Sequence, residues 1–252
     1  MSYIPNILWI GALAVAMFAP ANLDAATSDD KKRPSRDAVI ETFLQVAFTD
    51  QASDEWQHAR RWPASARIAI EGRYETEDAT KVAHTRDLIR RVTQRNMPIF
   101  FSPLSADEKT QTQIVVAFVP PAAFSKTRKR IAEDFNHSSK AYGLFATSPD
   151  CQLALLAKSP AHLGFAIVLV ANEQEYEARA HCVTKKLVQA MGFPGEVKVS
   201  KNTVFDQTAR AKPTLKDRAL LWLLYHPEFK PGLDTAKAAI RIRELLYREN
   251  LK

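Results

Sequence analysis

The chain has 252 residues, of which 46% are hydrophobic and 25% are charged, and its formal net charge is +7. These are ordinary globular values, so the composition excludes a low-complexity chain and allows a sizeable core. The excess of basic residues favours anionic partners such as lipid headgroups, anionic glycans or nucleic acid, although it is also compatible with simple solubility.

The N-terminal segment predicts an export signal over residues 1–26. Residues 7–18 form a short apolar run that is followed by Pro20 and small residues suited to cleavage. The alternative is an uncleaved membrane anchor, but the run is well below the roughly 20 residues that a membrane-spanning helix needs. We therefore expect an exported protein that is periplasmic after cleavage and begins with a flexible polar leader over residues 27–34.

The remainder, residues 35–252, is expected to form a single α+β domain with C-terminal helices. Apolar residues at helical spacing predict the helices, and alternating or continuous apolar runs predict the strands. In chain order the expected elements are a helix capped by Ser35, strands at 67–72, 98–102 and 114–119 with a helix at 78–96 between the first two, a helix after Pro121, strands at 141–147, 152–157 and 164–171, and helices at 173–191, 214–225 and 235–249. Because strands and helices do not alternate strictly, a mixed sheet packed with helices is favoured over a parallel α/β fold.

The two cysteines, Cys151 and Cys182, are the only thiols in the sequence. In an oxidising periplasm a single disulfide between them is expected. Two separate buried thiols are one alternative. Another is a catalytic Cys182 with the adjacent His181, but neighbouring side chains on a helix point about 100° apart and do not readily form a nucleophile and its base.

The helix that ends in CVTKKLVQAMGF has the length and apolar spacing of the active helix of a zinc peptidase. Such a helix carries two histidines one turn apart, and a glutamate that activates the metal-bound water. When the closing glycines are aligned, Lys185 takes the first ligand position and Lys186 the position of the general base. Gln189 takes the second ligand position, and a third ligand would fall on Gly195. Because a protonated lysine repels a cation and glutamine is a poor zinc ligand, we expect no metal, no cofactor and no catalysis by this route.

Each of these positions has a simpler interpretation beside the functional one. Lys185 and Lys186 would bind an anionic group in a remnant cleft, or they are solvated charges on the exposed side of the helix, which is the favoured interpretation. Gln189 would bind a peptide backbone, or it satisfies buried backbone groups. His181 follows Glu177 by one turn; the two would form part of a metal site or, as we prefer, a surface contact.

Several short motifs occur in order along the chain. They are the Phe43–Phe48 helix, Arg61-Trp62-Pro63 with the strand to Gly72, Cys151, Cys182-x6-Gln189-Ala-Met-Gly192-Phe, Thr203-Val-Phe-Asp206, Leu215-Lys-Asp217 with Leu223-Leu-Tyr225, and Pro231-Gly232. Together they resemble proteobacterial exported proteins and lipoproteins catalogued as domain of unknown function 2927, over roughly residues 38–235.

That family looks like a degenerate relative of zinc metallopeptidases, typically with Glu-Glu-Leu-x-Gln-x-Leu-Gly in the central helix. The resemblance implies a zincin-like scaffold that lacks the metal ligands. It also implies that the segment 203–206 lies near the position of a peptidase's methionine turn, and that the 215–225 helix matches its C-terminal helix. This chain departs from the family by carrying Lys185 and Lys186 in place of the acidic pair.

These observations predict an exported, non-catalytic domain that binds a protein, a peptide or another component of the cell envelope. The candidate residues of a degenerate cleft are Lys185, Lys186, Gln189 and His181. One alternative is a hydrolase with an unrecognised active site. The other is a basic module for anionic envelope surfaces, using the arginines at 86–95 or the run 126–130, for which solvated helix faces are the simpler interpretation. No nucleic-acid motif accompanies these residues, so nucleic acid is not an expected partner.

Overall fold

A computed structural model describes residues 33–48, 57–102, 105, 107, 111–136, 142–148, 150–197, 203–206 and 212–248. The expected signal peptide and all but the end of the expected leader lie outside these residues. None of the helices in the described part of the chain is long and apolar enough to cross a membrane.

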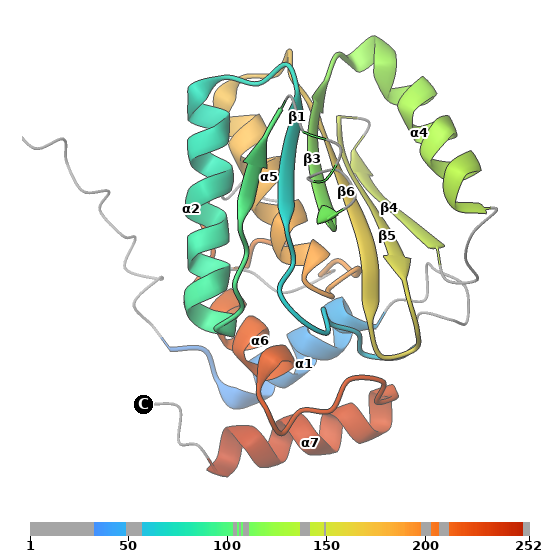
Figure 1. Cartoon of the computed structure of the whole chain (residues 1–252). Coiled ribbons are helices and arrows are strands. Elements are labelled where there is room, and N and C mark those ends of the chain that lie inside the picture. Colours follow the sequence, from blue (N-terminus) through green and yellow to red (C-terminus); the bar gives the residue numbers. More distant parts are fainter. Residues whose placement is uncertain are drawn as a thin grey trace, which may run out of the picture.

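Strands and helices occur where the apolar patterns predict them, and the mixed α+β architecture is confirmed (Figure 1). The strands are β1 (Ile68–Gly72), β2 (Ile99–Phe101), β3 (Ile114–Val119), β4 (Tyr142–Ser148), β5 (Cys151–Ala157) and β6 (Leu163–Ala171). The helices are α1 (Arg36–Ala47), α2 (Thr76–Thr93), α4 (Pro121–Asn136), α5 (Tyr176–Ala190), α6 (Leu215–Tyr225) and α7 (Thr235–Arg248).

The described strands form one six-stranded sheet in the order β2-β1-β3-β6-β5-β4. Strands β2, β1, β3 and β6 run parallel to one another. Strand β5 is antiparallel to β6, and β4 is antiparallel to β5. The register aligns Ile70, Val116, Val168 and Leu153 across four adjacent strands. All four side chains are fully buried, so this row forms the floor of the main core.

Side-chain alternation along β3 and β6 gives the sheet two covered faces. On β3, Ile114, Val116 and Phe118 join the main core, whereas Ala117 and Val119 face a smaller cluster with Phe124 of α4. Figure 1 shows α2 and α5 on one face of the sheet and α4 on the other. The central helix α5 therefore lies directly on the sheet, in the larger of the two cores.

Local signals in the sequence fix the starts of two helices. The Ser35 hydroxyl accepts a hydrogen bond of 3.2 Å from the backbone amide of Ala38, as expected for an N-cap. At α6, Thr214 and Asp217 form a reciprocal capping box. These contacts satisfy backbone amides that an unfinished helix turn leaves without partners.

The expected disulfide is present between Cys151 and Cys182, whose Cα atoms are 5.6 Å apart. It joins the first residue of β5 to the middle of α5. A second contact holds the beginning of α5: Arg179 donates to Asp78 over 2.9 Å and to Glu75 over 2.6 Å, both at the start of α2. Helix α5 is thus fastened both to the sheet below it and to the helix beside it.

Candidate functional site

The second half of α5 is buried on every side. Each residue from Cys182 to Ala190 is buried, including both lysines. The end of the helix is enclosed by Trp62, whose indole nitrogen donates to the Ala190 carbonyl over 3.0 Å. It is also enclosed by Tyr225, whose hydroxyl donates to the Met191 carbonyl over 2.9 Å.

The interpretation of Lys185 and Lys186 as solvated charges is therefore wrong. The two residues are only 4% and 0% exposed. The prediction relied on the rarity of buried lysine in general. It failed because α5 has no solvent-facing side in this region, where the sheet, α2 and the segments around Trp62 and Tyr225 surround it.

The two lysines have different polar partners. The Lys185 ammonium lies 3.3 Å from the Glu196 carboxylate, on the segment that follows the helix. The Lys186 ammonium donates to Oε1 of Gln189 over 2.9 Å. Burial, reinforced by the positive charge of Lys185 and opposed by Glu196, lowers the pKa of Lys186 to about 7. The side chain of Lys186 can therefore be either charged or neutral near neutral pH.

Gln189 connects this pair to the next segment of the chain. Its side-chain nitrogen donates to the Gly195 carbonyl over 3.1 Å, which agrees with the interpretation that it satisfies a buried backbone group. Lys186, Gln189 and Gly195 thus form one chain of polar contacts. These are the positions of the general base, the second ligand and the third ligand in the alignment with a zinc-peptidase helix. The fold brings them together, but they carry an amine, an amide and a backbone carbonyl.

The position expected for a third ligand has no room for a side chain. A Cβ atom on Gly195 would lie 2.4 Å from the backbone oxygen of Gln45, which is far inside van der Waals contact. The amide of Gly195 also donates to the Val46 carbonyl over 2.8 Å. The C-terminal end of α1 therefore occupies the space that a ligand side chain at this position would need.

His181 and Glu177 occupy the first turns of α5, where His181 is half-buried and Glu177 exposed. Within the described ranges, no three side chains of the histidine, cysteine, aspartate or glutamate type are grouped so that they would hold a metal ion.

A second buried polar cluster joins the segment 203–206 to the beginning of α6, which are separate motifs in the sequence. The Asp217 carboxylate accepts hydrogen bonds from the hydroxyls of Thr203 and Thr214. It also accepts from the backbone amides of Val204 and Thr214. Burial raises the pKa of this carboxyl group, and the surrounding donors oppose that rise. Asp217 belongs to the Leu215-Lys-Asp217 motif of the sequence, but its contact with Thr203 depends on the fold and has no local signal.

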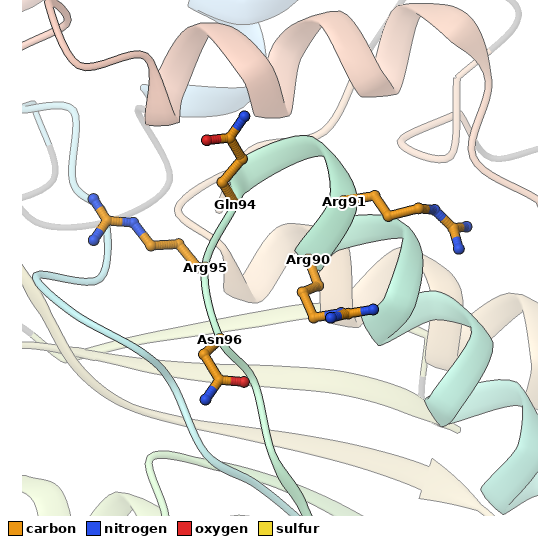
Figure 2. Close-up of a pocket in the computed structure, with 5 residues that line it drawn as sticks. All are labelled: Arg90, Arg91, Gln94, Arg95 and Asn96. Atoms are coloured by element: carbon orange, nitrogen blue, oxygen red, sulfur yellow. The ribbon is translucent and has the colours of Figure 1, made fainter.

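A basic surface lies at the C-terminal end of α2. Its hollow of about 410 Å³ is lined by Arg90, Arg91, Gln94, Arg95 and Asn96. Figure 2 shows Arg90 and Arg91 extending to one side of the helix end and Arg95 to the other. The charges therefore spread over a surface and do not converge on a single point.

Arg61 extends this surface toward α6. The guanidinium carbons of Arg61 and Arg95 each lie 5.9 Å from the centre of the Tyr225 ring. Arg61 donates to the backbone oxygens of Leu224 and His226, at the C-terminus of α6. Burial and the positive charge of Arg95 lower the pKa of Arg61. We use "basic surface" below for Arg61, Arg90, Arg91 and Arg95.

The basic surface has few acidic partners. Arg90 lies 3.7 Å from Asp87, which also pairs with Arg86. Within the described part of the chain, no carboxylate lies within 4.0 Å of the guanidinium of Arg91 or Arg95. Sequence reasoning grouped the arginines at 86–95 as a solvated face and missed Arg61, which lies a long way from them in the sequence.

One comparison with known proteins gave a match. The family model described as "Protein of unknown function (DUF2927)" matches residues 36–244. No match was found among curated proteins or among solved structures. The matched range includes α5, both cysteines and the basic surface.

Proposed function

The chain belongs to the DUF2927 family of proteins of unknown function, and we propose that it is an exported, non-catalytic domain that binds an anionic component of the cell envelope through the basic surface. Residues 1–26 serve as the signal peptide in this proposal. The observation that carries it is the pair Arg91 and Arg95 at the end of α2, which have no carboxylate within 4.0 Å among the described residues.

The non-catalytic part of the proposal rests on the residues at the centre of α5. We infer a zincin-like scaffold in which the helix is retained and the metal site is filled from within. The amine of Lys186, the amide of Gln189 and the backbone of Gly195 satisfy one another. Such a donor set does not suit zinc, which requires imidazole, thiolate or carboxylate ligands.

The burial of the residues at the centre of α5 also determines where a partner would bind. The earlier hypothesis placed a protein or peptide in a degenerate cleft at Lys185, Lys186, Gln189 and His181. The two lysines and Gln189 are at most 4% exposed, so a ligand would have to displace packed side chains to reach them. The basic surface requires no such rearrangement, and we therefore assign binding to it.

The anionic class of the ligand follows from charge. Arg61 and Arg95 are held near the same ring, and the positive charge of Arg95 disfavours the charged state of Arg61. A bound anion would relieve this repulsion. Because Arg91 and Arg95 extend in opposite directions, an extended polyanion would reach both, whereas a single small anion would not.

The proposal is tested by binding of the mature protein to dextran sulfate, a soluble polyanion, as a function of salt. Arg91→Gln combined with Arg95→Gln is expected to weaken binding roughly 30-fold, since a charge near an anionic surface contributes about 1 kcal/mol. Binding of the wild type is expected to weaken as salt increases. Arg73→Gln combined with Lys126→Gln removes the same charge from exposed positions elsewhere and is the matched control.

Two outcomes would overturn the proposal. One is an equal loss of binding in the control, which would show that net charge alone decides the affinity. The other is wild-type binding that does not depend on salt. Hydrolytic activity that disappears in His181→Ala would instead support the alternative of an enzyme with an unrecognised site.

A further inference from the structure

The outer face of α7 carries an exposed stripe of apolar and basic residues. Ile240 and Tyr247 are 58% and 55% exposed, which are high values for large hydrophobic side chains. With Ala236 and Arg243 they recur at helical spacing along one side of the helix, and all four are exposed. The opposite side, with Ala238, Ile242, Leu245 and Leu246, is fully buried in the core. The exposed stripe is therefore not needed to hold the helix in place.

The charges around this stripe are mainly basic or already neutralised. Within the described residues, Arg243 has no carboxylate within salt-bridge distance. The two acidic neighbours are paired: Glu244 with Arg241 over 2.8 Å, and Glu228 with Arg241 and Arg248 over 2.6 and 2.5 Å. An approaching anionic surface would thus meet an unpaired cation between two apolar side chains.

The Tyr247 ring has a second cation beside it. The guanidinium carbon of Arg36, at the start of α1, lies 4.7 Å from the ring centre. An aromatic ring with a polar hydroxyl, next to a guanidinium, is a combination that suits the boundary between lipid headgroups and acyl chains. Ile240 and Tyr247 are two helical turns apart, so both would enter that boundary when the helix lies parallel to it.

We propose that α7 docks on an anionic membrane leaflet, with Ile240 and Tyr247 inserted among the headgroups and Arg243 and Arg36 beside lipid phosphates. This is the arrangement of an interfacial amphipathic helix, here anchored to a folded domain by its other face. The inference rests on the proposed function and specifies its anionic partner as lipid. Figure 1 shows the C-terminal end of α2 and helices α6 and α7 toward the same end of the molecule, which allows the basic surface to assist.

A membrane fits this face better than a folded protein partner does. The stripe presents two large apolar side chains seven residues apart, and protein interfaces instead concentrate apolar residues in a contiguous central patch. Lipid headgroups adapt to such a surface, and anionic lipids satisfy the unpaired arginine.

The test is flotation of the mature protein with vesicles of phosphatidylglycerol and phosphatidylethanolamine, compared with vesicles of phosphatidylcholine alone. The wild type is expected to float with the anionic vesicles only. Ile240→Ser combined with Tyr247→Ser is expected to weaken this binding at least tenfold while dextran sulfate binding stays unchanged. Phe101→Ser, which removes an aromatic ring that is 52% exposed at the edge strand β2, is the matched control and keeps wild-type binding.

The outcomes separate this inference from the proposed function. Binding to dextran sulfate without binding to anionic vesicles would overturn the membrane inference and leave the proposed function intact. Binding to neither would overturn both. Loss of vesicle binding in Phe101→Ser equal to that in the α7 variant would also overturn the role of α7, because it would attribute the effect to exposed apolar area in general.

Discussion

The side-chain nitrogen of Lys186 lies 2.9 Å from Oε1 of Gln189, one turn further along α5. Both residues are completely buried. At this site the amide dipole of Gln189 faces a potential positive charge, and the removal of an ammonium group from water is costly.

This arrangement predicts a specific dependence of stability on pH. The pKa of Lys186 is about 7 in the folded protein and about 10.4 in an unfolded chain. Between these values the unfolded state binds more protons than the folded state, so the free energy of unfolding rises with pH. The slope of the free energy of unfolding that this group contributes is at most about 1.4 kcal/mol per pH unit. Below about pH 7 and above about pH 10 the group adds no pH dependence.

Lys186→Met should remove this contribution. We expect the variant to be more stable than the wild type at pH 6, by about 1–3 kcal/mol, and its advantage to shrink as the pH rises from 7 to 10. Urea unfolding at unit pH intervals measures the difference. The exposed Lys126→Met is the control and should follow the wild type. Parallel curves for Lys186→Met and the wild type would contradict the prediction.

Removal of the disulfide should destabilise the protein. Cys151 and Cys182 are 31 residues apart in the sequence, and a loop of this size corresponds to about 4 kcal/mol of stabilisation in the chain-entropy description. The variant with both cysteines changed to alanine is therefore expected to unfold at lower guanidinium concentration. A reducing agent should lower the midpoint of the wild type and leave the variant unchanged; an unaffected wild type would show that the bond is absent in the purified protein.

Gly192→Ala should be among the most damaging small substitutions. The φ angle of Gly192 is +123°, and a Cβ atom there would lie 2.1 Å from the backbone oxygen of Arg60. We expect a loss of at least about 2 kcal/mol, or failure to fold, because both the backbone conformation and the space exclude alanine. Gly164→Ala, whose Cβ would approach only to 3.3 Å of the Lys158 Cβ, is the control. Similar melting temperatures for the two variants would refute this account.

Asp217→Asn is expected to destabilise the fold by about 3 kcal/mol. The carboxylate accepts hydrogen bonds from Thr203, Thr214 and Val204, and an asparagine amide would place a donor against some of these donors. Asp234→Asn serves as the control because Asp234 pairs with Lys237 at the surface, where such a change costs less than about 1 kcal/mol. Thermal unfolding of both variants measures the contrast, and equal stability would rule out a central role for Asp217.

The positions of the helices and strands were predictable because their signals are local. Apolar periodicity located the elements, and Ser35 and Thr214 marked helix starts through hydrogen bonds to amides within three residues. The disulfide was also predictable, since only one pairing of two cysteines exists.

The environment of α5 was not predictable in the same way. Lys185 and Lys186 are buried because segments distant in sequence cover them, and no feature of the helix itself reports that cover. The same holds for Thr203 with Asp217, and for Arg61 with Arg95 around the Tyr225 ring. The sequence identified most of these residues as parts of motifs, but only the fold showed which of them are neighbours.

The position of α1 has a consequence for the order of events in folding. This helix precedes every other described element, yet it packs against α6 and α7 near the other end of the chain. Its Gln45 and Val46 also close the space beside Gly195. Contacts between such distant segments form slowly and only after both have been synthesised. The part of the core that α1 shares with α6 and α7 is therefore completed only once those two helices have been synthesised.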